Sequence, residues 1–148
     1  MWKIKHGLTN TSEFKAWSSM KERCLCKTNK AYKNYGERGI SICKEWVDSF
    51  ENFLKDMGKK PSREYSLDRI NNNKSYTPEN CRWATNTQQN RNKRTTTNIS
   101  TNVRGVSCKN NRYEVRICAN KKRISLGTYP NIEEAIEARK NGEYKYWS

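Results

Sequence analysis

The segment from Ser66 to Asn92 constrains the fold more than any other part of this chain. The run from Asn71 to Pro78 is rich in residues that favour turn angles, so it predicts a turn between two short strands. Asn80 then begins the second strand and lies beside Asp68 of the first strand. The polar run from Asn86 to Lys93 contains no Gly or Pro, which favours a short helix. The sequence therefore predicts two strands and a helix around one small site.

The side chains of this segment are those that a hard divalent cation prefers. Such an ion promotes phosphodiester hydrolysis by neutralising charge on the phosphate and the leaving oxygen, and it binds carboxylate, amide and water oxygens. Asp68 supplies the carboxylate, and the predicted helix returns amide side chains toward it. We take Asn90 as the second ligand, with Gln89 and Asn92 as alternatives. The pattern predicts a site for magnesium or manganese.

The run D-R-I-N-N-N-K-x-Y-x-P-x-N-C-R-W-A-T, at 68–85, resembles the HNH nuclease family, whose fold is the ββα-metal finger. The upstream run Y-G-E-R-G-I, at 35–40, is similar to a phage-encoded branch found in homing and restriction-like nucleases. The resemblance implies that Asp68 is a catalytic metal ligand and that Asn80 orders the loop. It also implies that Arg38 clamps a phosphate in the active site.

One position departs from the family pattern, because Arg69 stands where most members have a histidine general base. An arginine cannot deprotonate in water, so Arg69 is not the base. Some HNH-type restriction enzymes are similar in carrying arginine there, with a tyrosine and a metal-bound water sharing the role. We expect Arg69 to stabilise developing phosphate charge instead. The candidates for the base are Tyr76, Tyr65, Tyr35 and His6.

The six cysteines include no CxxC pair and therefore no simple zinc motif. In a reducing cytosol they are expected as free thiols or metal ligands, not as disulfides. A structural zinc ion would stabilise a small domain whose hydrophobic core is small. Its ligands would be His6, Cys24, Cys43 and Cys81, with Cys26 as a substitute for Cys24. The alternative is that these cysteines are buried small hydrophobes.

The first seventy residues predict a helical scaffold. Thr11 or Ser12 favours a helix start, and a second helix covers about Val47 to Met57 and ends at Gly58. The first helix presents an apolar face at helical spacing, which we expect in the core. That face consists of Phe14, Trp17, Met20 and Cys24.

Beyond residue 102, three strand patterns are followed by a helix pattern. The strands at 103–107, 112–118 and 122–126 are separated by Asn and Lys turns, and the helix covers 131–146. Apolar residues alternate with polar ones in the middle strand, so one sheet face packs on the helix. The opposing helix face would consist of Ile132, Ala135, Ile136 and Tyr144.

This C-terminal region contains R-G-V-S-x-x-x-N-R-Y-x-V-R-I, then K-K-R-I-S-L-G-T-Y and E-E-A-I-E-A-R. It resembles the APETALA-two/ethylene-response-factor DNA-binding domain, which lays its sheet in the major groove. The resemblance implies that basic side chains of the sheet contact DNA. These are Arg104, Arg112, Arg116 and Arg123, with Lys122 on a phosphate.

The charge of the chain indicates the same partner. Thirty Lys and Arg residues against fifteen Asp and Glu give a net charge of +15, which favours double-stranded DNA. No apolar run approaches the ~20 residues that a membrane span needs, and the N-terminus lacks the apolar centre of a signal peptide. We therefore expect no membrane partner and a cytoplasmic protein, and the nuclease resemblance implies a phage or bacterial host cell.

These observations predict an α+β protein with a nuclease domain at 1–92, a basic linker at 93–102 and a DNA-binding domain at 103–148. The expected activity is divalent-metal-dependent DNA cleavage of a homing or restriction-like kind. One such site cuts one strand, so a double-strand break would need a homodimer or two nicks. The first alternative is a catalytically inactive HNH-fold DNA-binding regulator or accessory protein. The second is a binder of single-stranded DNA or RNA, in which aromatic side chains stack on bases.

Overall fold

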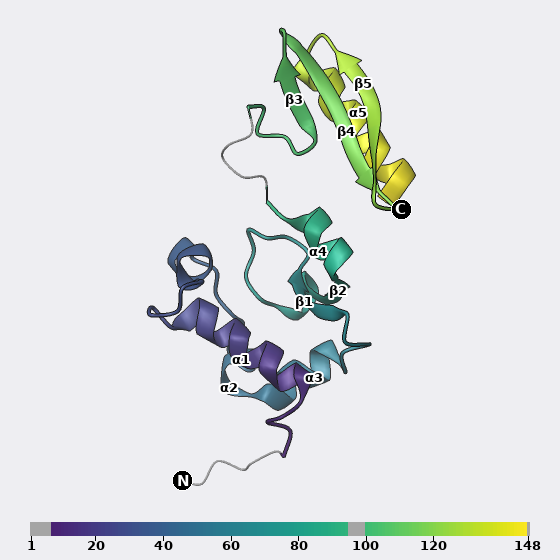
Figure 1. Cartoon of the computed structure of the whole chain (residues 1–148). Helices are drawn as coiled ribbons and strands as arrows, with labels where there is room; N and C mark the ends of the chain where they lie inside the picture. Colours follow the sequence, from purple (N-terminus) through teal and green to yellow (C-terminus); the bar gives the residue numbers. More distant parts are fainter. Residues whose placement is uncertain (1–6, 95–99, 148) are drawn as a thin grey trace. The chain divides into compact units, whose positions relative to one another are not determined.

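The computed structural model describes residues 7–94 and 100–147. The chain divides into two compact units, Met1–Lys93 and Arg94–Ser148, and each has its own hydrophobic core. The fold is α+β (Figure 1). In the part of the chain that the structure describes, no helix is both long and apolar enough to cross a membrane. Residue His6 and residues 95–99 of the predicted linker lie outside the described residues.

Helix α1 (Ser12–Leu25) begins at Thr11, whose hydroxyl accepts a hydrogen bond from the Phe14 N–H at 3.2 Å. This bond satisfies one of the free N–H groups at the helix start, which favours Ser and Thr at this position. Met20 and Cys24 of the predicted apolar face are buried. Phe14 and Trp17 pack against the same core, as their helical spacing predicts.

The second predicted helix is two helices, α2 (Lys44–Asp48) and α3 (Phe50–Met57). Between them Ser49 is extended, with φ −140° and ψ 125°, and its side chain accepts from Asn52 N at 3.2 Å. A serine at this position therefore caps a new helix and ends the preceding one. Two short 3₁₀ turns, η1 (Tyr32–Asn34) and η2 (Gly36–Arg38), lie between α1 and α2.

Aromatic side chains from α2 and α3 fill the core of the first unit. Trp46 and Phe53 are fully buried and meet edge to face, with ring centroids 5.0 Å apart. Each buried aromatic side chain contributes roughly 2 kcal/mol through the apolar surface removed from water. Trp83 of the neighbouring sheet donates from its indole N–H to Met57 O at 2.9 Å, which ties the sheet to the end of α3.

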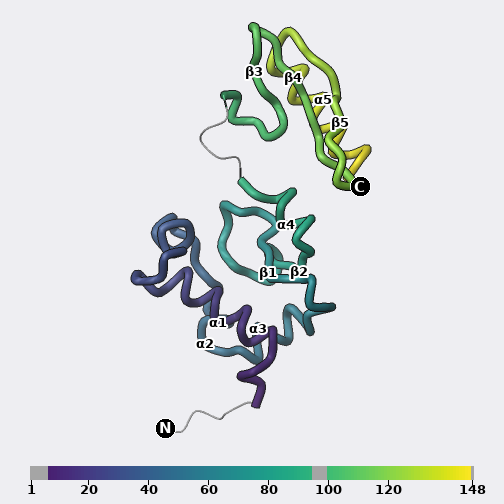
Figure 2. Tube along the Cα trace, viewed as in Figure 1, coloured from purple at the N-terminus to yellow at the C-terminus, as the bar shows by residue number. Residues whose placement is uncertain are grey.

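A two-stranded antiparallel sheet completes the first unit. Strand β1 (Tyr65–Arg69) pairs with β2 (Cys81–Thr85), and a wide loop with the 3₁₀ turn η3 (Pro78–Asn80) joins them (Figure 2). Helix α4 (Asn86–Asn92) follows β2 directly. Thr85 and Gln88 form a reciprocal capping box that fixes its first turn.

The second unit is a three-stranded antiparallel sheet packed on one helix (Figure 1). Strands β3 (Val106–Lys109), β4 (Arg112–Ala119) and β5 (Lys122–Tyr129) lie in that order, and α5 (Ile132–Trp147) covers one face. Both hairpin turns have two central residues with positive φ, which Asn tolerates better than most residues. These are Asn110 and Asn111, then Asn120 and Lys121.

The buried face of α5 differs from the predicted one. Tyr144, expected in the core, is 82% exposed, whereas Ala135 is buried as predicted, and Arg139 and Gly142 are buried without having been predicted. These three recur at helical spacing and so share one face. A Cβ at Gly142 would lie 2.3 Å from Leu126 Cδ1, so the leucine side chain would have to shift to admit a larger residue there. An apolar pattern misses this face because arginine and glycine count as non-apolar.

Candidate functional site

The β1–β2 hairpin and α4 gather side chains around the carboxylate of Asp68. Asn92, the last residue of α4, donates from Nδ2 to Asp68 Oδ2 at 3.2 Å and Oδ1 at 3.4 Å. The same amide donates to the backbone carbonyl of Arg69. Arg82 lies opposite Asp68 in the register, and its Nε pairs with Oδ2 at 3.2 Å. The Asp68 side chain, 10% exposed, is therefore held by a helix end and by the neighbouring strand.

The amide that meets Asp68 is Asn92, which corrects the choice of Asn90. Asn90 is exposed on α4. Successive helix residues turn by about 100°, so side chains two residues apart point in different directions. Gln89 faces the sheet but binds elsewhere, donating to the hydroxyl and carbonyl of Ser66 and to Ala84 O at 3.4 Å. Gln89 therefore fixes α4 to the hairpin, and Asn92 takes the position beside the carboxylate.

Asn80 shapes the loop and does not lie beside Asp68 as predicted. The register pairs Asp68 with Arg82, which puts Asn80 beyond the end of β2. Its Oδ1 accepts from Asn71 N at 2.9 Å, and its Nδ2 donates to Asn71 O at 3.1 Å and Ser75 O at 2.9 Å. A buried amide with partners for both its atoms holds the intervening loop in one conformation.

Arg69 belongs to the core of the first unit. It is 5% exposed and lies on the face of β1 away from Asp68, because successive strand residues point to opposite faces. Its Nη1 donates to Lys74 O at 2.9 Å, and its guanidinium carbon lies 5.0 and 4.9 Å from the ring centroids of Tyr35 and Tyr76. This burial corrects the expectation of a phosphate contact, since the guanidinium stabilises the strand and loop and exposes little surface.

A second arginine faces the same two rings. The guanidinium carbon of Arg23, from α1, lies 5.0 Å from the Tyr35 centroid and 5.3 Å from that of Tyr76. The rings are nearly parallel, with an interplanar angle of 19° and centroids 6.4 Å apart. Each cation–π contact of this kind contributes about 1 to 2 kcal/mol when desolvated. The four side chains join α1, the η1–η2 region and the loop before β2.

The tyrosine candidates for the general base lie in different surroundings. Tyr76 is 2% exposed, and burial raises the pKa of its phenol well above the ordinary value, so it stays protonated at neutral pH. Tyr35 stacks on it in the same cluster. Tyr65 begins β1 opposite Thr85. His6 lies outside the described residues, so the base stays unassigned.

Arg38 bridges two loops at the surface of the first unit. It is exposed, and its Nη1 donates to Asn34 O at 3.0 Å. Its Nη2 donates to Asn73 Oδ1 at 3.1 Å, across to the loop that Asn80 shapes. The role of Arg38 as a phosphate clamp stays a prediction.

The cysteines predicted as zinc ligands lie in or near the core. Cys24 and Cys81 are buried and Cys43 is half-buried. Burial raises the pKa of all three thiols, that of Cys81 to about 12, whereas zinc binds the thiolate. Among the described residues, no group of three or more His, Cys, Asp or Glu side chains is placed to hold a metal ion. Cys26 is exposed and bonds to Thr28 Oγ1 at 3.1 Å; the zinc site stays a prediction.

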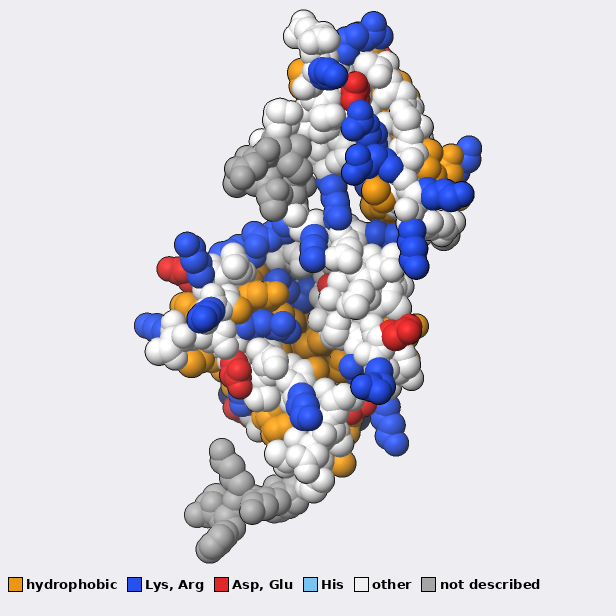
Figure 3. Space-filling view, in the orientation of Figure 1, with side chains coloured by type: hydrophobic (Ala, Val, Ile, Leu, Met, Phe, Trp, Pro, Cys, Tyr) orange, Lys and Arg blue, Asp and Glu red, His pale blue; other side chains and the backbone are white. Residues whose placement is uncertain are grey.

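Basic side chains follow the sheet of the second unit. Arg116 opposes Ser125 and Arg123 opposes Cys118, and all four residues are exposed. Arg112 is exposed at the start of β4. Figure 3 shows lysine and arginine side chains along the sheet of this unit. The structure therefore brings these three predicted DNA contacts to exposed positions on β4 and β5.

The other two predicted contacts occupy different positions. Lys122 opposes Ala119, whose side chain is buried. Cross-strand partners point to one face, so Lys122 lies on the α5 side at the end of the hairpin. Arg104 is half-buried just before β3, next to Gly105.

Sequence reasoning missed Arg82 as the partner of Asp68. Counting outward from the predicted turn at 71–78 pairs Asp68 with Cys81, one residue away from the observed partner, so the turn alone did not give this register. The chain matches no protein-family model, no curated protein and no solved structure. The function must therefore be argued from the residues and their geometry.

Proposed function

We propose that this protein is a divalent-metal-dependent DNA endonuclease of the HNH type, whose second unit binds duplex DNA. The observation that supports this most is the contact of Asp68 with Asn92, 24 residues apart in sequence and 3.2 Å apart at their side-chain atoms. They meet in a strand, strand and helix order, which is the order that the sequence resemblance implies.

Asp68 and Asn92 would hold magnesium or manganese. Both side chains offer hard oxygen atoms, and turning the Asn92 amide presents its oxygen in place of its N–H donor. Mg²⁺ usually keeps several waters and takes further oxygens from phosphate, so two protein ligands fit this ion. When bound, the ion would neutralise charge on the scissile phosphate and the leaving oxygen.

The other residues of the first unit would position this pair. Gln89 fixes the distance of α4 from β1, and Asn80 fixes the loop above the site. Arg82 Nε pairs with Asp68 Oδ2 at 3.2 Å, so a bound ion would have to displace this charge or share the carboxylate with it. Arg38, at the exposed edge of the same loop, would contact a backbone phosphate.

The second unit would deliver the nuclease to DNA. A net charge of +15 attracts the phosphate backbone, and exposed arginines on β4 and β5 suit groove contacts. The cleaved site would then be set by the sequence that this unit binds, as in homing or restriction-like cleavage. A homodimer or two successive nicks would be required for a double-strand break.

The test is conversion of supercoiled plasmid by the full-length protein with Mg²⁺ or Mn²⁺. We expect nicked or linear product that disappears with a chelator, with Asp68→Ala and with Asn92→Ala. Asn90→Ala, on the same helix but exposed, is the matched control and should retain cleavage. Gel shifts should show that all three variants still bind duplex DNA. Cleavage that persists in Asp68→Ala would contradict the proposed site.

A second candidate is a DNA-binding regulator without nuclease activity. Two observations favour it: Arg82 pairs with the only carboxylate of the site, and the residue in the position of the usual base, Arg69, is buried. This candidate predicts tight duplex binding with no cleavage on a randomised target library in either metal. Asp68→Ala would then leave every DNA-dependent readout unchanged.

A further inference from the structure

Four arginines from four parts of the second unit line one pocket of about 370 Å³. Arg104 precedes β3, while β4, β5 and α5 contribute Arg116, Arg123 and Arg139. No lining residue is acidic. The sequence resemblance singled out three of these arginines as separate DNA contacts, but it did not predict a shared pocket or include Arg139.

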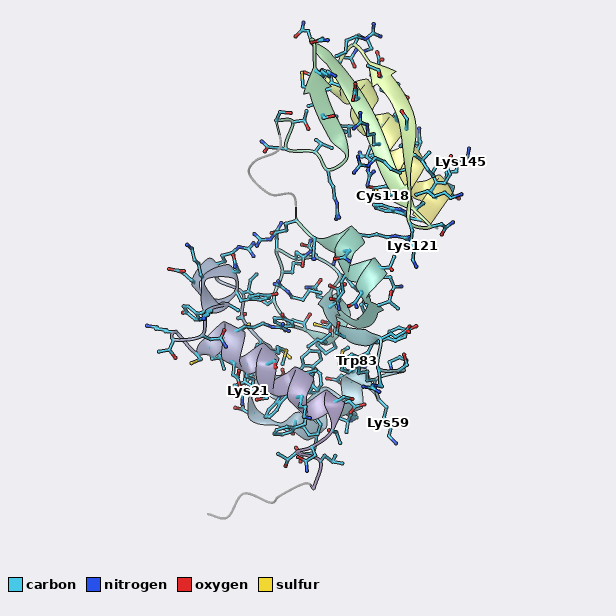
Figure 4. All side chains as sticks on the ribbon, in the orientation of Figure 1. Lys21, Lys59, Trp83, Cys118, Lys121 and Lys145 are labelled. Atoms are coloured by element: carbon cyan, nitrogen blue, oxygen red, sulfur yellow. The ribbon has the colours of Figure 1, made fainter. Side chains whose placement is uncertain are left out.

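The pocket lies where β3 stops covering β4. The β3–β4 pairing ends at Val106 and Val115, and beyond it Arg116 N donates to Gly105 O at 2.8 Å. The next carbonyls on this side of β4 are capped by α5. Arg139 donates from Nη1 to Arg116 O, and Trp147 donates from its indole N–H to Cys118 O at 2.9 Å. Figure 4 labels Cys118 on this part of β4. Along this edge of β4, side chains from α5 therefore donate the hydrogen bonds that a neighbouring strand would otherwise donate.

Arg139 forms a fixed positive wall of the pocket. It is 5% exposed, its Nε donates to Glu143 Oε1 at 2.9 Å, and its guanidinium lies 4.7 Å from the Trp147 ring centroid. The bonds to Glu143 and to the Arg116 carbonyl use two of its N–H groups, whereas a guanidinium has five. Arg139 thus keeps donors for an anion without paying further ordering entropy.

Gly105 permits this arrangement. A Cβ at residue 105 would lie 2.5 Å from Arg116 O and 2.7 Å from Arg139 Nη1. Its φ of +79° is also a conformation that favours glycine. The close approach of the backbone to Arg139 therefore depends on the absence of a side chain at this position.

The charges around the pocket are unbalanced. Glu114 pairs with Arg116 at 2.6 Å and Glu143 with Arg139 at 2.9 Å, and both carboxylates lie outside the lining. The lining itself holds four guanidinium groups and no carboxylate. An anion between these groups would offset the repulsion among their like charges.

We propose that this pocket binds a phosphoryl group. Guanidinium groups match phosphate oxygens in pairs of parallel hydrogen bonds, and several of them around one cavity exceed what a carboxylate needs. The group would come from the DNA backbone or from free phosphate. The DNA source rests on the DNA binding proposed above, whereas the pocket itself does not depend on nuclease activity.

The test follows the indole N–H resonance of Trp147 in the full-length protein, assigned with Trp147→Phe. Pyrophosphate is added at constant ionic strength, with chloride as the reference anion. We expect a saturable shift, weakened about tenfold or more by Arg104→Gln or Arg123→Gln. Lys140→Gln, an exposed neighbour of Arg139 with the same charge change, should leave it intact. Arg104 and Arg123 are used because replacing buried Arg139 alters the fold of the pocket.

A duplex oligonucleotide distinguishes the two sources. If DNA shifts the same resonance and pyrophosphate competes, the pocket takes a backbone phosphate, and Arg104→Gln should reduce the salt slope of DNA binding by about one. If only pyrophosphate shifts it, the ligand is free phosphate. No saturable shift with either probe, or equal weakening by Lys140→Gln, overturns the proposal. Failure of plasmid cleavage with the shift retained would instead reject the nuclease.

Discussion

Each unit of this protein buries one arginine, and the two are buried for different purposes. Arg69 and Arg139 are both 5% exposed, and each donates to a backbone carbonyl, of Lys74 and of Arg116. Arg69 is otherwise surrounded by tyrosine rings, and no carboxylate among the described residues pairs with it. Arg139 has a carboxylate partner in Glu143 and also lines a pocket.

The comparison shows that burial alone does not identify a functional arginine. The guanidinium of Arg69 contacts the Lys74 carbonyl and two tyrosine rings, so it stabilises a strand and a loop inside the first unit. Arg139 is fixed as firmly, but on a cavity wall with other guanidinium groups. A buried cation is a candidate binding group when it lines a cavity together with other cations, as Arg139 does. Four measurements would break or sharpen this distinction.

The largest effect is expected from Arg69→Ala. The variant removes the bond to Lys74 O and two ring contacts and leaves a cavity, which should cost about 3 kcal/mol of unfolding free energy. Urea unfolding followed by tryptophan fluorescence measures this loss. Arg82→Ala, on the exposed neighbouring strand, is the control. A loss as small as that of the control would mean that Arg69 is not part of the core scaffold.

A smaller loss, confined to the second unit, is expected from Arg139→Lys. Lysine keeps the charge but cannot bind Glu143 and the Arg116 carbonyl together in the same geometry, which should cost about 2 kcal/mol. Hydrogen exchange by mass spectrometry should show faster exchange in β4 and α5 than in the native protein. Peptides from α1 should be unchanged. Equal acceleration in α1 would show that the two cores are not independent.

Alkaline pH should weaken the first unit. Burial raises the pKa of Cys81 from 9.0 to about 12, so the folded state holds a proton that the unfolded state releases. This contribution is fully present below pH 9.0 and is lost toward pH 12, by up to about 1.4 kcal/mol for each pH unit. Urea midpoints measured from about pH 8 to about pH 10 test it. Cys81→Ala should reduce the slope; an unchanged slope would assign the effect elsewhere.

The smallest effect on stability is expected from Arg82→Gln. An ion pair whose arginine is 41% exposed contributes at most about 0.5 kcal/mol, so unfolding should barely change. If Asp68 and Asn92 bind a divalent ion, removing this competing charge should tighten Mn²⁺ binding several-fold. Titration of Mn²⁺ by electron paramagnetic resonance measures this. Weaker binding would mean that Arg82 orients the carboxylate more than it competes with the ion.

The elements that form from local signals could be predicted from the sequence. Thr11 starts α1, the Asn-rich turns close the hairpins of the second unit, and α4 covers nearly the predicted residues. Ser49 was missed, although serine is a common helix cap, because the apolar spacing continued through it. Each of these features depends on residues that are neighbours in the chain.

Two features of the site could not be predicted from the sequence pattern: the direction in which the α4 side chains point, and the burial of Arg69. Which amide meets Asp68 depends on the phase of α4, and the capping box of Thr85 and Gln88 sets that phase. The T-x-x-Q signal in the sequence marks the start of α4, and Gln89 and Asn92, three residues apart, both face the hairpin. The burial of Arg69 had no comparable signal, since arginines usually lie at the surface.

The direction of α4 has an electrostatic consequence for the site. The helix runs from Thr85 to Asn92, so its C-terminal end, with carbonyl oxygens that lack helical partners, lies beside Asp68. Aligned peptide dipoles give such an end a partial negative charge of up to about half an elementary charge. The carboxylate and the helix end therefore create one region of negative potential, which a cation stabilises. Arg82 supplies that positive charge in the structure, and under the proposed function a divalent ion would be an alternative source of it.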